Sequence, residues 1–333
     1  MGSLRVVAFS ALFLLLLVDL EAALIGEKQW TTYKRQFNKT YAPEHDYYHR
    51  WIFSAVDKLV RKNNIEYAQG KVAYFLKVNE YSDTDRSAVY ANPPSMPAES
   101  IQGTGSKPAN YKYYHEIQGG IDWRESGFVS PVRHQGECNS CWAFSTAGLL
   151  ETHMAKKTGR RVAMSPKHLL DCVEKNGGCD GGWVSHAINY TRDNGISSWE
   201  SYSPYKPQND VCVYNPRGNQ VLPRGYVILE PNEKKMAEVV YNIGPVTVSL
   251  DHLYTEFYEY SRGILSIPDC RNGKGFLKHS MLVVGFGTDP EGRDYWLIKN
   301  SFGEKWGENG YVRLARNAGN MCGVASLPQY PVF

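Results

Sequence analysis

The chain has 333 residues, of which 42% are hydrophobic and 21% charged. This composition is ordinary for a globular protein with room for about two domains, and it excludes a disordered or collagen-like chain. The formal net charge of +3 gives no reason to expect a polyanionic partner such as nucleic acid.

The first residues have the pattern of a cleavable signal peptide. Arg5 precedes an apolar run over 6–18, and the small residues Ala22 and Ala23 follow. The run is too short to span a bilayer, and no later run reaches the roughly 18 apolar residues of a membrane helix. We therefore predict a signal peptide over 1–22 and a soluble protein of the secretory pathway with no membrane partner.

The next part of the chain has helical periodicity and no cysteine. Trp30, Tyr33 and Phe37 recur at helical spacing, and similar apolar spacing continues over 51–60, so residues from about 24 to 90 read as helical. The stretch 91–110 is rich in Pro, Gly and Ser, which is typical of a linker. Because proteolytic nicking concentrates in exposed linkers, this piece indicates a removable pro-segment.

Beyond the linker, a helical half precedes a β-rich half. Ser140 can cap a helix that begins at Cys141 and stops at Gly159, and a second helix is expected near 183–192. After about residue 221, short β-rich runs follow at 246–250, 281–287, 295–300 and 311–315. The order predicts an α+β fold.

All seven cysteines lie between Cys138 and Cys322. In the oxidising secretory pathway, six of them would form three disulfides, and the seventh would be a reactive thiol or an intermolecular link. Cys141 lies at the first turn of the expected helix, where N–H groups and the helix dipole should lower the pKa of a thiol. Local chemistry also allows Cys138 and Cys141 to form a zinc half-site or a redox pair, although no second CxxC and no matching histidine pair exists.

A nucleophilic cysteine needs a base, and the chain has nine histidines. His153 and His186 fall within expected helices, where a lone histidine is usually solvated. His279 begins an apolar strand that would hold its ring rigidly. Spacing alone does not decide among these histidines.

The segment CNSCW (138–142) resembles the C-G-[SA]-C-[WY] signature of the papain-like cysteine proteases. In that family a histidine and an asparagine follow far downstream, and here His279 and Asn300 follow in that order. Gln135 stands six residues before Cys141, and further family motifs occur at 165–172, 178–183 and 300–311. The resemblance covers nearly the whole chain.

The pro-segment shares in this resemblance. Trp30, Tyr33, Phe37 and Tyr41 resemble the first pro-helix of cathepsin L-like zymogens. The family then implies an inhibitory propeptide over 23–116, with its linker near 91–110, and a peptidase domain over 117–333. It further implies a papain-like two-domain fold, with a helical left domain and a β-barrel-like right domain, and propeptide removal at acidic pH.

The resemblance also assigns roles. Cys141 as thiolate would attack the peptide carbonyl, and His279 as imidazolium would protonate the leaving amine. Asn300 would accept a hydrogen bond from the His279 ring and orient it. The Gln135 side-chain amide and the Cys141 backbone N–H would stabilise the oxyanion. The implied disulfides are Cys138–Cys179, Cys172–Cys212 and Cys270–Cys322, which leave Cys141 free.

The family's substrate cleft supplies a further set of expected residues. The Gly181-Gly182 backbone would pair with an extended peptide as an added strand. The pocket for the P2 side chain would be lined by Trp183, Val184, Ser249, Leu277, Ser280 and Leu327. None of these is charged, so an apolar P2 residue is expected. Core packing is the alternative role for Trp183 and Leu327.

Three positions depart from the family pattern. Asn139 replaces a glycine, and Asn tolerates a left-handed backbone better than most residues. Phe302 replaces a tryptophan that covers the Asn–His hydrogen bond, and a phenyl ring would cover it less completely. Lys278 precedes His279 where Asp or Asn is common. Either its cation lowers the pKa values of both catalytic groups, or the side chain points to solvent and has no effect.

The remaining expectations concern partners and modifications. The resemblance implies a lysosomal or secreted endopeptidase, acting as a monomer on protein and peptide substrates without cofactor or metal. Its inhibitors would be its own propeptide and cystatin-like proteins. Asn38 and Asn189 begin N-x-[ST] sequons for glycosylation. Two rival functions are a catalytically weakened homologue acting as a binding protein and a thiol–disulfide oxidoreductase using Cys138 and Cys141.

Overall fold

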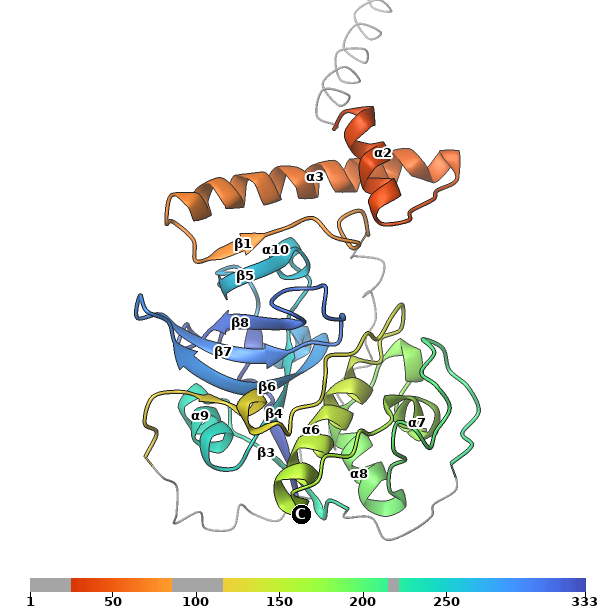
Figure 1. The fold of residues 1–333 in the computed structure, drawn as a ribbon, viewed down its shortest axis with the longest axis vertical. Coiled ribbons are helices and arrows are strands. Elements are labelled where there is room, and N and C mark those ends of the chain that lie inside the picture. Colours follow the sequence, from red (N-terminus) through yellow and green to blue (C-terminus); the bar gives the residue numbers. More distant parts are fainter. Residues whose placement is uncertain (1–24, 86–115, 215–221) are drawn as a thin grey trace, which may run out of the picture. The chain divides into compact units, whose positions relative to one another are not determined.

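The computed structural model describes residues 25–85, 116–214 and 222–333, and the chain divides into two compact units (Figure 1). The first comprises Met1–Val72 and Leu76–Val89, and the second comprises Ala73–Phe75 and Tyr90–Phe333. The predicted signal peptide (1–22) and linker (91–110) lie outside the described residues. Within the described ranges, no helix is both long enough and apolar enough to cross a membrane.

The first unit contains helices α2 (Glu27–Gln36) and α3 (Pro43–Ala68). Its core is aromatic: Trp30 is fully buried, stacks on Tyr33 and packs against Phe53. Helical structure from about 24 to 90 was expected, and over the described residues 69–85 this is wrong. The chain turns at Gly70, whose φ of 71° suits glycine, and leads into strand β1 (Tyr74–Leu76).

The helices of the second unit form its first half, as expected. They are α6 (Cys141–Thr158), α7 (Pro166–Cys172) and α8 (Val184–Asn194), which lie together beside the sheet in Figure 1. Gly159 ends α6 in the left-handed conformation. A cluster of buried residues from all three helices, including Trp142, Leu169 and Ala187, holds them together.

The rest of this unit is a twisted sheet with order β1-β5-β8-β7-β6-β4-β9-β3, and β2 pairs with β6 off this path. The strands are β2 (Ile121–Asp122), β3 (Gly225–Ile228), β4 (Val246–Leu250), β5 (Tyr260–Leu265), β6 (His279–Thr288), β7 (Asp294–Lys299), β8 (Tyr311–Ala315) and β9 (Gln329–Val332). Two helices lie within this half, α9 (Glu233–Asn242) and α10 (Thr255–Tyr258). The predicted α+β class is confirmed.

The interface between α6 and the sheet positions the candidate site. Leu149 of α6 packs with Leu282 and Val284 of β6 in one hydrophobic cluster. This packing brings the N-terminus of α6 and the N-terminus of β6 into one region. His153, expected to be solvated, is instead buried on α6, and its Nε2 bonds the carbonyl oxygen of Pro245 at 2.8 Å.

Candidate active site

Cys141 is the first residue of α6, and its thiol is the free one among the seven cysteines. The other six form Cys138–Cys179, Cys172–Cys212 and Cys270–Cys322, the same pairs that the resemblance implies. Because Cys138 is bonded to Cys179, it cannot act with Cys141 as a redox pair or zinc half-site. The oxidoreductase alternative is therefore wrong.

The sulfur of Cys141 lies beside the start of β6. The backbone N–H of Ser280 donates to Cys141 Sγ at 3.4 Å. Since His279 is the neighbour of Ser280 in the same strand, the nucleophile candidate from the helical half and the base candidate from the sheet belong to one site. His279 begins β6, as the sequence predicts.

The orientation of the His279 ring follows from its hydrogen bond. Its Nε2 lies 2.7 Å from Asn300 Oδ1, and the same oxygen accepts the N–H of Ser301 at 2.8 Å. An atom that accepts a backbone N–H must be the amide oxygen, so Nε2 of His279 must be the donor. Neutral His279 therefore carries its proton on Nε2, and Nδ1 keeps a lone pair.

Aromatic rings surround this hydrogen bond. Phe302 lies 4.9 Å from the His279 ring between centroids, and Phe257 meets the same ring edge-on at 6.1 Å. His279 and Asn300 are 2% and 4% exposed. Phe302 alone was expected to cover the hydrogen bond between His279 and Asn300 incompletely. Because several aromatic rings surround this bond, it is well shielded from water.

Burial controls the protonation of both groups in the full-length chain. It raises the pKa of the Cys141 thiol, although backbone N–H groups of Ser280 and Trp142 lower it. It lowers the pKa of His279 to about 4, although the bond to Asn300 raises it. The expected low pKa of Cys141 is therefore wrong for this buried site. The helix amides act in the expected direction, but desolvation outweighs them.

Gln135 is held by hydrogen bonds on several sides. Its backbone N–H donates to Ser301 O at 2.8 Å, and its Oε1 accepts from Ser301 Oγ at 2.6 Å. Its Nε2 donates to Cys138 O at 2.7 Å. Because a primary amide has two N–H groups, one remains for the oxygen of a bound substrate.

Three of the residues expected to bind substrate lie on three different elements. Val184 begins α8, Ser249 lies in β4, and Ser280 lies in β6. Ser249 and Ser280 are directly opposite in the sheet register, with their hydroxyl oxygens 3.2 Å apart. Leu277 and Leu327 are both buried, whereas Trp183 is half-buried. Val184 also packs with Leu149 and Ile188 in the hydrophobic core.

The Gly181-Gly182 segment is fixed by Asn176. The side-chain oxygen of Asn176 accepts the N–H of Trp183 at 2.9 Å, and its Nδ2 donates to Trp183 O at 3.2 Å. A Cβ on Gly182 would lie only 2.5 Å from the Asn176 side chain. Glycine at this position therefore permits the close approach of Asn176 that holds this segment in place.

The two sequons lie in different parts of the chain and differ in exposure. Asn38 has a positive φ of 53° just after α2 and is exposed. Asn189 lies half-buried on α8, and its Oδ1 accepts from Arg192 at 3.1 Å. Thr191, the third residue of that sequon, is buried.

The structure shows the backbone conformation of Asn139 and the surroundings of Lys278, two positions that depart from the family pattern. Asn139 does not adopt a left-handed backbone, so the turn between the two cysteines does not need this property. Its N–H donates to Cys179 O at 3.0 Å. Lys278 is half-buried, and the pKa of its amine is lowered by burial and by the nearby Arg271.

Sequence patterns missed two residues of the site. The ring of His252 is fully buried and stacks on His279 with centroids 4.7 Å apart. It lies just after β4 and in no motif, so no sequence signal marked it. Ser301 follows Asn300 in a recognised motif, and that adjacency was the available signal for its contacts with Gln135 and Asn300.

Comparison with known proteins agrees with this geometry. Residues 117–332 match the papain family cysteine proteases, and residues 30–88 match the cathepsin propeptide inhibitor domain. Cathepsin L of Sarcophaga peregrina is 38% identical over 315 residues, which cover 92% of each chain.

Solved structures of precursors are similar over the same extent. Digestive procathepsin L 3 from the larval midgut of Tenebrio molitor is 34% identical, with a TM-score of 0.80 over 92% of this chain and 99% of that one. The proform of the ragweed pollen cysteine protease Amb a 11 is 29% identical, with a TM-score of 0.79 over 94% and 97%. The chain therefore belongs to the papain family of cysteine proteases, as a cathepsin L-like peptidase preceded by its inhibitory propeptide.

Proposed function

We propose that this zymogen yields an endopeptidase in which Cys141 is the nucleophile and His279 the general acid and base. The observation that supports this most directly is the free thiol at the N-terminus of α6, with the N–H of Ser280 on its sulfur. The neighbouring His279 is oriented by Asn300. A nucleophile, a base and an orienting group are thus present in one site.

The reaction would begin with transfer of the thiol proton from Cys141 to Nδ1 of His279. The thiolate attacks the peptide carbonyl carbon, and the C=O electron pair moves to the oxygen. The N–H of Cys141 and the free N–H of the Gln135 amide stabilise this oxyanion. His279 gives its proton to the leaving nitrogen as the C–N bond breaks, and water then hydrolyses the thioester with His279 as base.

The resemblance supports several finer proposals about maturation. The propeptide would span 23–116 and the mature enzyme 117–333, with removal at acidic pH after a signal peptide over 1–22. The mature monomer would act in the lysosome or be secreted, and cystatin-like proteins would inhibit it. Asn38 and Asn189 are proposed glycosylation sites, the first of which leaves with the propeptide.

The proposed P2 preference is for an apolar side chain. Val184, Leu277 and Leu327 supply apolar surface, and the two serine hydroxyls of Ser249 and Ser280 contact each other. None of the six expected pocket residues carries a charge. A P2 arginine would therefore lose its hydration without gaining a carboxylate partner.

One experiment tests the central assignment. The purified precursor is activated at acidic pH, treated with a thiol-directed epoxide peptide, and the adduct is mapped by mass spectrometry. We expect labelling at Cys141 and loss of peptide hydrolysis, whereas Cys141→Ser should be neither labelled there nor able to hydrolyse the peptide. Labelling elsewhere, or an activated chain that hydrolyses no peptide, would overturn the assignment. The second result would instead favour the alternative of a weakened homologue that acts as a binding protein.

A further inference from the structure

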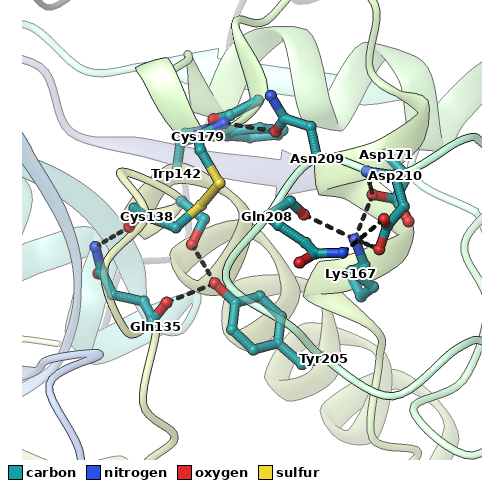
Figure 2. Close-up of a disulfide and its surroundings, with 12 residues drawn as sticks. Gln135, Cys138, Trp142, Lys167, Asp171, Cys179, Tyr205, Gln208, Asn209 and Asp210 are labelled. Carbon is teal, nitrogen blue, oxygen red and sulfur yellow. Dashed lines mark hydrogen bonds and ion pairs between the residues drawn. A yellow bond between two sulfur atoms is a disulfide. The ribbon is translucent and has the colours of Figure 1, made fainter.

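We propose that Tyr205 is a positioning residue that fixes the oxyanion donor Gln135, an inference that rests on the proposed function. Figure 2 shows the hydroxyl of Tyr205 directed at Gln135. The phenol donates to the backbone oxygen of Gln135 at 2.6 Å, and its oxygen lies 2.8 Å from Ser140 Oγ. A phenol has one proton, so Ser140 must be the donor in the second bond.

The contact with Tyr205 completes the restraint on Gln135. The other polar groups of Gln135 are already bound: its N–H and Oε1 by Ser301, and one amide N–H by Cys138 O. Tyr205 binds the backbone carbonyl, so only the second amide N–H is left for the substrate. The residue can then neither rotate about its backbone nor swing its amide, so its free N–H keeps one direction.

The same phenol accepts the hydroxyl proton of Ser140, a residue that does not cap α6. Serine at the N-cap usually accepts a hydrogen bond from the N–H groups of the first turn. Ser140 occupies the N-cap position, but its side chain makes no capping bond and donates to Tyr205 instead. The N–H of Trp142, which a capping serine could bind, therefore acts on the sulfur together with the N–H of Cys141.

Tyr205 can restrain other residues because its own loop is anchored (Figure 2). Lys167 is 1% exposed, and its Nζ lies 2.7 Å from carboxylate oxygens of both Asp171 and Asp210. The same amine donates to Gln208 O at 2.8 Å. A buried cation with several partners is costly to move, since any shift leaves a charge unpaired.

A disulfide, a hydrogen bond and a packing contact add to this anchor. The disulfide Cys172–Cys212 closes the loop to α7, and Asn209 Oδ1 accepts the N–H of Cys179 at 2.8 Å. Pro207 packs on Gly136, because a Cβ on Gly136 would lie only 3.0 Å from the proline ring. The loop 205–212 thus connects α7, the Cys138–Cys179 disulfide and the segment that carries Gln135.

The test is Tyr205→Phe, which removes the phenol oxygen and keeps the ring that meets Phe144 edge-on at 4.8 Å. We expect kcat for a peptide substrate to fall by about 10-fold with KM within about twofold, because the oxyanion exists only in the transition state. Alkylation of Cys141 by iodoacetamide forms no oxyanion from a carbonyl. We therefore expect its pH dependence to shift only through the freed Ser140, by less than about half a unit.

A double-mutant cycle shows whether Tyr205 acts through the Gln135 amide. Gln135→Ala keeps the backbone carbonyl that Tyr205 binds but lacks the amide. In this background Tyr205→Phe should change kcat by less than about twofold. The matched control is Tyr202→Phe, which removes a nearby phenol outside the loop 205–212, bonded to Asp171 at 3.2 Å, and should leave kcat unchanged.

Three results would overturn the inference: an unchanged kcat in Tyr205→Phe, an equal loss in the Gln135→Ala background, or an equal loss in Tyr202→Phe. If Tyr205→Phe does not fold, Ser140→Ala removes the donor to the phenol. Its kcat should fall about threefold, and only when the Gln135 amide is present. Failure of the proposed function is distinguishable, because the wild-type enzyme would then itself hydrolyse no peptide.

Discussion

The side-chain oxygen of Asn300 lies 2.7 Å from Nε2 of His279. This contact keeps the lone pair of neutral His279 on Nδ1, as described above. We predict that Asn300→Ala lowers kcat by about 10- to 100-fold, which is no more than the low end of what general acid–base catalysis contributes, because the ring loses its fixed orientation but not its chemistry. Steady-state kinetics on a fluorogenic peptide measure this. Asn242→Ala at the end of α9 is the control, and an equal loss there would point to damage to the fold instead.

The second prediction concerns Gln135, whose amide keeps one N–H free. Gln135→Ala should lower kcat by about 100-fold, or about 3 kcal/mol of transition-state stabilisation, with little change in KM. The rate of Cys141 alkylation should stay near that of the wild type, since alkylation forms no oxyanion. Gln208→Ala, which keeps the backbone oxygen bound by Lys167, serves as the matched control. If alkylation slows as much as peptide hydrolysis, Gln135 supports the thiolate and not the oxyanion.

Leu327 allows a pocket role to be separated from a core role. It is 1% exposed, and the sequence left both roles open. If it lines the P2 pocket, Leu327→Ala enlarges the pocket, and kcat/KM for P2 Phe over P2 Val should rise by about 3- to 10-fold. If it serves only the core, the unfolding free energy falls by about 2–5 kcal/mol and the P2 preference is unchanged. Peptides that differ only at P2, together with thermal denaturation, measure the two effects.

The elements of the peptidase domain could be predicted largely from local patterns. Gly159 ends α6 because a left-handed C-cap favours glycine, and His279 begins β6 because the apolar run starts there. Local periodicity failed in the propeptide, where the chain leaves α3 after Ala68. There the side chain of Asn64 bonds both the N–H and the carbonyl of Leu76, a non-local pairing that periodicity does not report.

Protonation at the site was the harder property to predict. A cysteine at a helix N-terminus suggests a low thiol pKa, but this rule takes account only of the backbone N–H groups and not of burial. The burial of Cys141 depends on tertiary packing, and it reverses the direction of the shift. His153 was misjudged for the same reason, since its burial depends on where Pro245 lies. Contacts such as that between Tyr205 and Gln135 join residues 70 positions apart and have no local signal.

The next prediction concerns pH and Lys278. Arg271 and Asp251 are the charged groups that act on this lysine, and burial lowers the pKa of its amine. A cation beside the site disfavours imidazolium and favours thiolate, so it lowers the pKa values of both His279 and Cys141. Lys278→Asp should therefore shift both limbs of the kcat/KM profile to higher pH, by roughly half a unit. The control is Lys274→Asp, which makes the same charge change at an exposed position of the same loop. A wild-type profile in Lys278→Asp would show that Lys278 has no influence on the two pKa values.

The last prediction concerns acid stability and His168, which is fully buried on α7. Its Nδ1 accepts the N–H of Ser197 at 2.8 Å, so protonation of that nitrogen breaks the bond. Burial lowers the pKa of His168 from 6.5 to about 4. The unfolded chain therefore binds the proton first. The stabilisation from neutral His168 is complete above pH 6.5 and is lost as the pH falls toward 4, a loss on the order of 3 kcal/mol.

Denaturant unfolding of the full-length chain at pH 7.0 and 4.5 measures this loss, in a Cys141→Ser background that prevents self-cleavage. His168→Gln offers an amide oxygen to Ser197 but no group that titrates in this range. It should lose less stability than the parent between the two pH values, even if it is less stable at pH 7.0. His45→Gln, at an exposed position of α3, should behave as the parent does. An identical loss in His168→Gln and the parent would mean that other groups, with buried His153 as the first to test, account for the acid sensitivity.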